Sequence, residues 1–383
     1  PEDMKKKHSR ENLRIAMLGH KRIPSREGGI EIVVEELATR MAKRSHSVTC
    51  YNRKGHNVAG SEFDGTKLKT YKGVTLQEVF TIDKRGLAAM TASVSASFRA
   101  ALGNYDVVHI HAEGPAFMCW LPKLFGKKVI VTVHGLDHQR AKWGKFASWY
   151  IRSGEKNAVR FADEIIVLSK GVQDYFQNTY RRNTRFIPNG VNKAKPRKAR
   201  QITEKWGLTR DSYILYLGRI VPEKGERYLI EAFKQTKTDK KLVIAGGSSD
   251  TQACMDELKS LAKDDDRIIF TGFVQGEILE ELYSNPYIYT LPSDLEGMPL
   301  SLLEAMSYGN CCLTSDIPEC AEVVEDKALL FRKSDVSDLK AKLQNACDHP
   351  EMVDGYKAQA EEFICRKYNW ADVVEKTLKL YQR

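Results

Sequence analysis

Residues 213–225 read Tyr-Ile-Leu-Tyr-Leu-Gly-Arg-Ile-Val-Pro-Glu-Lys-Gly, an apolar run that ends in a glycine and two cations. The run is short and rich in branched and aromatic side chains, and therefore predicts a buried strand. Similar runs recur along the chain and are separated by helical patterns. Alternation of helices with fully apolar strands predicts α/β sheets of parallel strands, covered on both faces.

The apolar runs fall into two groups, which predict two Rossmann-like, doubly wound parallel-sheet domains facing a central cleft. A polar stretch at residues 193–200 separates the groups. We place the N-terminal domain at residues 1–192, completed by an amphipathic C-terminal helix at 367–383, and the C-terminal domain at residues 193–366. The runs are 13–18, 47–51, 106–110, 128–133 and 164–168 in the first group, and 213–217, 241–245, 267–270, 287–291 and 311–314 in the second.

The composition is that of an ordinary globular protein. The 383 residues are 42% hydrophobic and 29% charged, which excludes disordered, collagen-like and polytopic membrane proteins. No apolar stretch approaches the ~20 residues of a spanning helix. The eight cysteines form no C-x-x-C pair, so we expect reduced thiols in a cytoplasmic protein, without disulfides or zinc.

Charge is divided unevenly between the two halves. Residues 1–190 contain 32 Lys and Arg against 18 Asp and Glu, whereas residues 191–383 contain 28 against 32. The net charges are therefore +14 and −4. A basic half favours an anionic partner, which leaves a membrane surface, nucleic acid or a phosphorylated acceptor open. A solvated lysine-rich surface is the alternative.

The strongest constellation follows the strand at 213–217. Gly218 and Arg219 end that strand, and Lys224 precedes the next helix five residues later. Two cations beside a helix N-terminus favour a site for a diphosphate, because the guanidinium and the ammonium can neutralise two phosphates together. The alternative is that both are ordinary surface residues.

A second constellation follows the strand at 287–291. Glu296 is followed by Gly297, Met298, Pro299 and Leu300, where a helix begins. Free backbone N–H groups at such a start can bind phosphate oxygens or sugar hydroxyls.

Glu304 lies eight positions after Glu296, inside the predicted helix. Two carboxylates around an anion-binding turn fit a sugar at one end and a ribose at the other, because they accept hydrogen bonds from hydroxyls. The alternative for Glu304 is a favourable interaction with the helix dipole.

At this point the sequence resembles the retaining family-four glycosyltransferases with the GT-B fold. Four motifs occur in the family's order, from about residue 13 to residue 381. They are Gly28-Gly-Ile-Glu31, Pro188-Asn-Gly-Val191, Gly218-Arg-Ile-Val-Pro-Glu-Lys-Gly225, and Glu296 with Glu304 inside Ser293-Asp-Leu-Glu-Gly-Met-Pro-Leu-Ser-Leu-Leu-Glu-Ala-Met306. One departure is Asn310, where the family usually has proline.

The resemblance implies a role for each matching residue. Arg219 and Lys224 would hold the diphosphate of a nucleotide sugar, and Glu304 would hold the ribose. Glu296 and the backbone of 297–300 would hold the donor sugar. The loop with Phe273 and Val274 would meet the base. From the first domain, Gly28 and Gly29 would approach the phosphates and His134 would face the anomeric carbon, with Asp137 as an assistant; His109 and His111 are expected to be structural.

The resemblance also implies a metal-independent reaction with retention at the anomeric carbon. No cofactor is expected, because Arg219 and Lys224 can neutralise the leaving group in place of Mg²⁺. Asp264, Asp265 and Asp266 precede a strand rather than follow one, unlike the D-x-D of metal-dependent transferases. No G-x-G-x-x-G follows the first strand, so a dinucleotide dehydrogenase is rejected.

The acceptor is expected on the basic N-terminal domain. Residues 134–152 mix cations with Trp143, Phe146, Trp149 and Tyr150, either as a core stripe or as a membrane interface. A glycan or polyprenyl-diphosphate acceptor at an anionic membrane would explain both features. The segment also resembles a rhamnosyltransferase-containing subgroup for bacterial polysaccharide, which implies a cytoplasmic enzyme, peripheral at the inner face of the plasma membrane.

The predicted partners are thus a UDP-, GDP- or dTDP-linked sugar and an acceptor, without nucleic acid. Two alternatives stay open at this point. One is a sugar-nucleotide epimerase with the GT-B fold. The other is a non-catalytic protein that binds an anionic surface or nucleic acid, which leaves the constellations of Arg219, Lys224, Glu296 and Glu304 unexplained.

Overall fold

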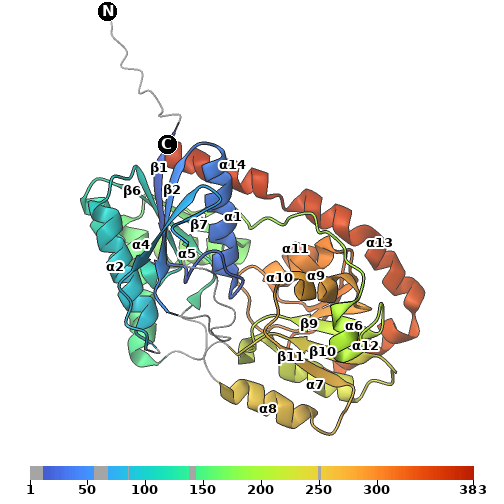
Figure 1. Cartoon of the computed structure of the whole chain (residues 1–383). Helices are drawn as coiled ribbons and strands as arrows, with labels where there is room; N and C mark the ends of the chain where they lie inside the picture. Colours follow the sequence, from blue (N-terminus) through green and yellow to red (C-terminus); the bar gives the residue numbers. More distant parts are fainter. Residues whose placement is uncertain (1–11, 56–67, 85, 138–143, 249–251) are drawn as a thin grey trace, which may run out of the picture. The chain divides into compact units, whose positions relative to one another are not determined.

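The computed structural model describes residues 12–55, 68–84, 86–137, 144–248 and 252–383, and the chain forms two compact units (Figure 1). Among the described residues, unit 1 contains those up to Ile187 together with 371–383, and unit 2 contains those from Pro188 to Trp370. Each unit has a parallel sheet with its own apolar core. The predicted α/β class with two Rossmann-like sheets is confirmed.

Unit 1 has an eight-stranded sheet in the order β3-β4-β2-β1-β5-β6-β7-β8. All neighbours are parallel except β3 and β4, which form a short antiparallel pair that the sequence patterns did not predict. The central strands are buried throughout, as expected for a sheet covered on both faces. The strands are β1 (Arg14–Leu18), β2 (Ser47–Arg53), β3 (Thr70–Tyr71), β4 (Val74–Val79), β5 (Val107–His111), β6 (Lys128–Val133), β7 (Glu164–Val167) and β8 (Arg185–Phe186).

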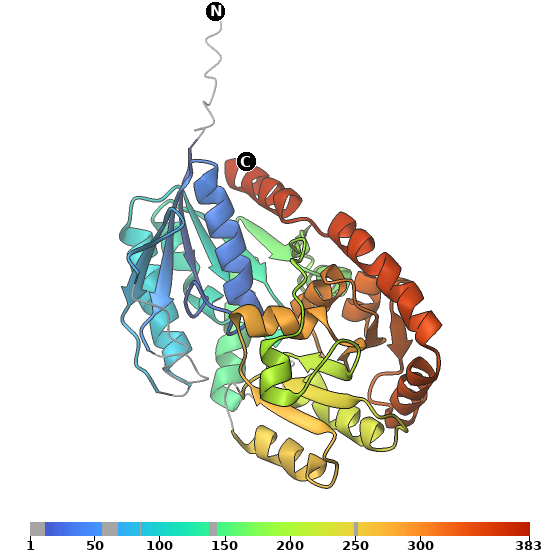
Figure 2. The ribbon, with the colours of Figure 1, turned by 45° about the vertical axis from the view of Figure 1, so that its right-hand side comes forward.

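Helices cover this sheet, and the last one comes from the end of the chain. Figure 1 shows α1 and α2 on opposite sides of the sheet, and α14 lies beside α1 there and in Figure 2. The hydroxyl of Tyr381 on α14 bonds the ring of His109 on β5, so α14 belongs to this unit. The helices are α1 (Gly29–Lys43), α2 (Ala88–Leu102), the 3₁₀ helix η2 (Pro115–Met118), α3 (Trp120–Leu124), α4 (Lys145–Phe161), α5 (Lys170–Tyr180) and α14 (Trp370–Gln382).

Unit 2 has a six-stranded, fully parallel sheet in the order β11-β10-β9-β12-β13-β14. The strand β9 therefore lies between β10, the next strand in sequence, and β12, which comes later in the chain. The strands are β9 (Tyr213–Leu217), β10 (Lys241–Ala245), β11 (Ile268–Gly272), β12 (Ile288–Leu291), β13 (Cys312–Ser315) and β14 (Leu329–Phe331). The helices are α6 (Gln201–Trp206), the 3₁₀ helix η4 (Pro222–Lys224), α7 (Glu226–Lys234), α8 (Gln252–Ala262), α9 (Gly276–Ser284), α10 (Leu300–Ser307), α11 (Pro318–Val324), α12 (Val336–Asp348) and α13 (Pro350–Lys367).

Helix α2 buries its small residues and exposes large ones. Its buried positions are all Ala or Ser, whereas Phe98 and Leu102 are 48% and 71% exposed. Small side chains let the helix axis come close to the sheet. The large apolar side chains of this helix instead lie on its exposed face. Folding of unit 1 does not require them there.

No helix within the described ranges is both long and apolar enough to cross a membrane. All eight cysteines are free thiols, as the sequence predicted.

The close approach of α4 to the segment after β5 gives a stability prediction. A Cβ on Gly154 would lie 1.9 Å from the carbonyl oxygen of Glu113, whereas a Cβ on Gly355, inside α13, would meet nothing within 4 Å. We expect Gly154→Ala to destabilise unit 1 by about 1–3 kcal/mol through overpacking. Gly355→Ala should instead stabilise its helix by about 0.5–1 kcal/mol.

Calorimetric unfolding of both variants checks this. Equal effects of the two substitutions on the unfolding transitions would contradict the contact between α4 and Glu113.

Candidate functional site

The turn after β9 is tied to the neighbouring strand through the backbone. Gly218 N–H donates to Ala245 O and Ile220 N–H donates to Gly247 O, both at 3.0 Å. Gly246 has φ +143°, and a Cβ there would lie 1.8 Å from Gly218 O, so the approach requires glycine. The half-buried Arg219 is thus placed at the carboxyl edge of the sheet.

Lys224 and Glu296, predicted from separate motifs, are in direct contact. Lys224 Nζ lies 2.6 Å from Glu296 Oε1, and the two side chains are 17% and 5% exposed. Ser293 Oγ donates to the same oxygen at 2.7 Å. The structure therefore joins the cation after β9 to the carboxylate after β12 as a shielded ion pair.

The backbones of these two loops also meet. Asp294 N–H donates to Glu223 O at 2.9 Å. Gly225 has φ +71°, and a Cβ there would lie 2.0 Å from Pro292 O. Glycine before α7 is thus needed both for the left-handed backbone and for the close packing of the loops.

A buried phenol lies beneath the predicted donor-binding segments. Tyr289 on β12 donates from its hydroxyl to Leu217 O at 3.1 Å. Burial raises the pKa of Tyr289 far above its usual value; a hydrogen bond with Ser301 opposes this, and the carboxylates of Glu296 and Glu304 add to it. The hydrogen bond from Tyr289 to Leu217 O links β12 to the end of β9 from inside the core.

Glu304 is half-buried on α10, among buried residues that fix the helix in the core. The turn before α10 also contacts the motif at 188–191, where Asn189 N–H donates to Met298 Sδ at 3.0 Å. Four of the predicted residues, from Gly297 to Leu300, therefore lie at the start of this helix. The sequence did not predict the contact with Asn189.

Phe273 and Val274 follow β11 and are half-buried. β11 is parallel to β10, and Gly246 N–H donates to Gly272 O at 3.0 Å. The ends of β9, β10, β11 and β12 lie on one edge of a parallel sheet. The predicted donor-binding residues of unit 2 thus share the edge where ligands bind in open α/β sheets.

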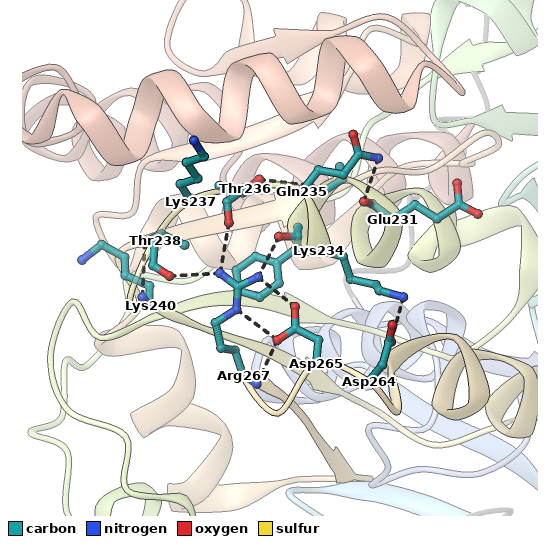
Figure 3. Close-up of polar contacts among 12 residues, drawn as sticks. Glu231, Lys234, Gln235, Thr236, Lys237, Thr238, Lys240, Asp264, Asp265 and Arg267 are labelled. Carbon is teal, nitrogen blue, oxygen red and sulfur yellow. Dashed lines mark hydrogen bonds and ion pairs between the residues drawn. The ribbon is translucent and has the colours of Figure 1, made fainter.

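Two acids of the triplet at 264–266, Asp264 and Asp265, form ion pairs after α8. Lys234 Nζ lies 2.8 Å from Asp264 Oδ1, and Arg267 lies 2.8 Å from Asp265 Oδ2 (Figure 3). Hydrogen bonds to Lys234 and Arg267, respectively, lower the pKa values of Asp264 and Asp265. Arg267 also donates to the carbonyls of Phe233, Thr236 and Thr238, so it holds the end of α7.

In unit 1, Gly28 and Gly29 lie at the start of α1. Gly28 is extended, and a Cβ there would lie 3.3 Å from Glu31 Oε2. Glu31 is 5% exposed, and the N–H of Lys21 approaches its carboxylate at 3.4 Å. The absence of a side chain at Gly28 leaves room for this buried acid at the helix start.

His134 directly follows β6, and its Nε2 lies 3.0 Å from Nδ1 of the buried His111. The ring of His111 stacks on His109 at 4.2 Å, and His109 bonds Thr132 at 2.7 Å as well as Tyr381. Burial lowers the pKa of His109 to about 3 and that of His111 well below 6.5. Both are neutral supporting rings, and the sequence missed the bond from His111 to His134.

Asp137 is held through its backbone, since its N–H donates to Glu113 Oε1 at 2.9 Å. Burial, together with the hydrogen bond with Glu155, raises the pKa of Glu113 above its usual value. Glu155 accepts hydrogen bonds from Tyr175 and Tyr180. An assisting role for the Asp137 carboxylate stays a prediction.

Two members of the aromatic stripe on α4 are exposed, whereas Tyr150 is half-buried against Phe117. Phe146 and Trp149 are 62% and 56% exposed, which contradicts the core alternative for these two residues. Trp143, Arg140 and Lys142 lie outside the described residues. Lys145, Arg152 and Lys156 are also exposed on this helix.

Two family matches cover both units. Residues 27–195 match Glycosyltransferase Family 4, and residues 198–363 match the family described as "Glycosyl transferases group 1". The chain is 25% identical to the alpha-maltose-1-phosphate synthase of Mycolicibacterium smegmatis, over 97% of this chain and 99% of that protein. It is 23% identical to the alpha-D-kanosaminyltransferase of Streptomyces kanamyceticus, over 72% and 76% of the two chains.

Solved structures share the fold. Sucrose-phosphate synthase from Thermosynechococcus elongatus superposes with a TM-score of 0.82 at 21% identity, covering 97% of this chain and 98% of that one. Anabaena HepE, in complex with UDP and glucose, gives 0.80 at 16% identity, covering 96% and 99%. These likenesses confirm the predicted architecture of two Rossmann-like domains.

Proposed function

The chain belongs to the glycosyltransferases that join a Family 4 domain to a group 1 domain, and we propose that it is a retaining enzyme of bacterial surface polysaccharide synthesis. It moves a sugar from a nucleotide-diphosphate donor to a glycan or a lipid-linked acceptor. The observation that carries this proposal is the shielded Lys224–Glu296 pair at the carboxyl edge of β9 and β12. A cation for phosphate and a carboxylate for hydroxyls are what such a donor requires.

Within the donor site, Arg219 and Lys224 hold the diphosphate and Glu304 holds the ribose hydroxyls. Glu296 and the backbone of 297–300 hold the transferred sugar, and the loop with Phe273 and Val274 meets the base. From unit 1 we assign Gly28, Gly29 and His134 to the phosphates and the sugar. HepE, which was solved with UDP-glucose, supports a nucleotide sugar as donor.

The proposed reaction proceeds on one face of the sugar. The bond from the anomeric carbon to the diphosphate oxygen breaks while the acceptor oxygen bonds the same face. The acceptor's hydroxyl proton passes to the departing diphosphate oxygen. Arg219 and Lys224 stabilise the negative charge that develops there, which is the role that Mg²⁺ has in other transferases. We therefore propose that the reaction needs no metal.

A panel of UDP-, GDP-, dTDP- and ADP-sugars tests the function. We expect a thermal shift and slow hydrolysis or transfer with one of them, since ligand bound to the folded state raises the unfolding temperature. Activity should persist in EDTA. Isomerisation of the donor would instead identify an epimerase, and absence of binding across the panel would contradict the donor site.

Removal of the ammonium tests the diphosphate site. We expect Lys224→Ala to lower kcat/KM by about 100- to 1000-fold, the usual loss for one group that stabilises transition-state charge. Because the alanine leaves the buried Glu296 unpaired, Lys224→Gln is the second variant: it can still donate to Glu296 but lacks the charge, and should lose as much activity. Arg227→Ala, at the exposed neighbour on α7, is the control, and near-normal activity of both Lys224 variants would exclude the proposed role.

We also propose that unit 1 docks on an anionic membrane where a lipid-linked acceptor is presented. All eleven large hydrophobic side chains that are exposed among the described residues belong to unit 1, including Phe98, Leu102, Leu124, Phe146 and Trp149. Cations accompany them on α4. Apolar anchors combined with basic charge are typical of interfacial binding.

Vesicle flotation measures this binding. We expect the protein to float with phosphatidylglycerol-containing vesicles, to bind pure phosphatidylcholine more weakly, and to lose most binding in a Phe146→Ser/Trp149→Ser variant. The control variant is Phe80→Ser, which replaces an exposed aromatic residue outside α4. Equal binding to neutral and anionic vesicles would contradict the electrostatic part of the proposal.

A further inference from the structure

Two buried side chains hold the 219–224 segment from behind. Tyr216 on β9 is 0% exposed and Glu226, the first residue of α7, is 1% exposed. The Tyr216 hydroxyl donates to Arg219 O at 2.8 Å and lies 3.0 Å from Glu226 Oε1. Val221 N–H donates to that same carboxyl oxygen at 3.2 Å. The backbone on both sides of Ile220 is thus tied to one phenol–carboxyl pair.

The hydrogen bonds of Tyr216 and Glu226 depend on how many protons the two side chains share. Tyr216 has one hydroxyl hydrogen, and the carbonyl of Arg219 can only accept. When that hydrogen points to Arg219, the contact between Tyr216 and Glu226 is a hydrogen bond only if Glu226 supplies a proton. Both contacts are therefore fully made with a neutral Glu226.

The surroundings favour the neutral acid. Burial raises the pKa of Glu226 to about 8, although hydrogen bonds from its own backbone, Tyr216 and Val221 and the charge of Lys224 act against the rise. On α8, burial raises the pKa of the half-buried Cys254 thiol to about 11, and the acids Glu226, Glu257 and Glu223 add to the rise. Lys224 is the cation among these neighbours, and a diphosphate bound to it would weaken its support for a charged Glu226.

We propose that Glu226 is a positioning residue: with Tyr216 it fixes the backbone between Arg219 and Lys224 for a diphosphate, and binding of the diphosphate increases the fraction of Glu226 that carries a proton. The inference deepens the proposed donor site and rests on it for the identity of the ligand. The hydrogen-bonded pair itself does not depend on the ligand, and can be tested without it.

The first test uses the unliganded protein. The pKa of Glu226 is about 8 in the folded protein, against the ordinary value of 4.5. Between pH 4.5 and pH 8 the unfolded chain binds fewer protons than the folded one. The free energy of unfolding therefore falls as the pH rises through this range. Glu226→Gln keeps the neutral donor and acceptor. Its unfolding temperature relative to the wild type should therefore rise from pH 5 to pH 8 and then level off.

Glu257→Gln, at an exposed acid on α8, is the matched control and should show no such trend. Parallel curves for the wild type and Glu226→Gln across this range would show that Glu226 is ionised, and would overturn the proposal.

The second test is calorimetric titration with UDP at pH 8 in buffers of different ionisation enthalpy. If bound diphosphate raises the pKa of Glu226 by one unit, its protonated fraction rises from one half to about nine-tenths. The wild type should then take up about 0.4 proton more on binding than Glu226→Gln. Any protonation of UDP itself is the same in both proteins and cancels in this difference. Glu226→Gln should keep its affinity within about threefold, whereas Glu226→Leu, which cannot bond Tyr216 or Val221, should bind at least about tenfold more weakly.

Equal proton uptake by the wild type and Glu226→Gln, or wild-type affinity of Glu226→Leu, would overturn the proposal. If neither UDP, GDP, dTDP nor ADP binds the wild type, the proposed donor site fails instead. In that case the pH series still decides whether Glu226 is protonated.

Discussion

The contact between Lys224 and Glu296 is the interaction around which the edge of the unit 2 sheet is arranged. Both charges are largely removed from water, so removing either one leaves the other without compensation, at a cost of several kcal/mol in typical buried pairs. The pair exists only because β12 lies beside β9, although seventy residues separate them in sequence. The glycine before α7, the Ser293 hydroxyl and the Tyr289 phenol all serve to hold the two loops at that distance.

Apolar periodicity predicted the main strands of both sheets, because strands buried on both faces must be apolar throughout. It missed β3, β4, β8 and β14. The strands β3, β8 and β14 have only two or three residues and so no period to detect, and Val74–Val79 alternates with polar residues. The placement of Arg219, Lys224 and Glu296 at one sheet edge could be predicted from the sequence, because residues that directly follow parallel strands lie at the same edge. Their roles in binding stay predictions. The hydroxyls of Tyr216 and Tyr289 could not be predicted, because an aromatic residue in an apolar strand indicates core until its neighbours are known.

The two units differ in how they use their surfaces. In unit 2 the unusual groups are buried polar ones that shape a loop, as with Glu226 and Tyr216. Unit 1 also buries polar groups such as His109, His111 and Glu113, but in addition it exposes large apolar side chains. On α2, for example, a face of Ala and Ser packs on the sheet while Phe98 and Leu102 remain exposed. Helix α2 thus combines a buried face of small residues with large apolar side chains on its exposed face.

The return of α14 to unit 1 has a consequence for biosynthesis. Residues 371–383 complete a unit whose other described residues end at Ile187, so on the ribosome the whole of residues 188–370 is translated before Tyr381 can reach His109. During that interval His109 sits in a nascent domain without its phenolic partner. Unit 2 can finish folding first, and a chain stopped short of Tyr381 would expose this defect to the cell's chaperones and proteases.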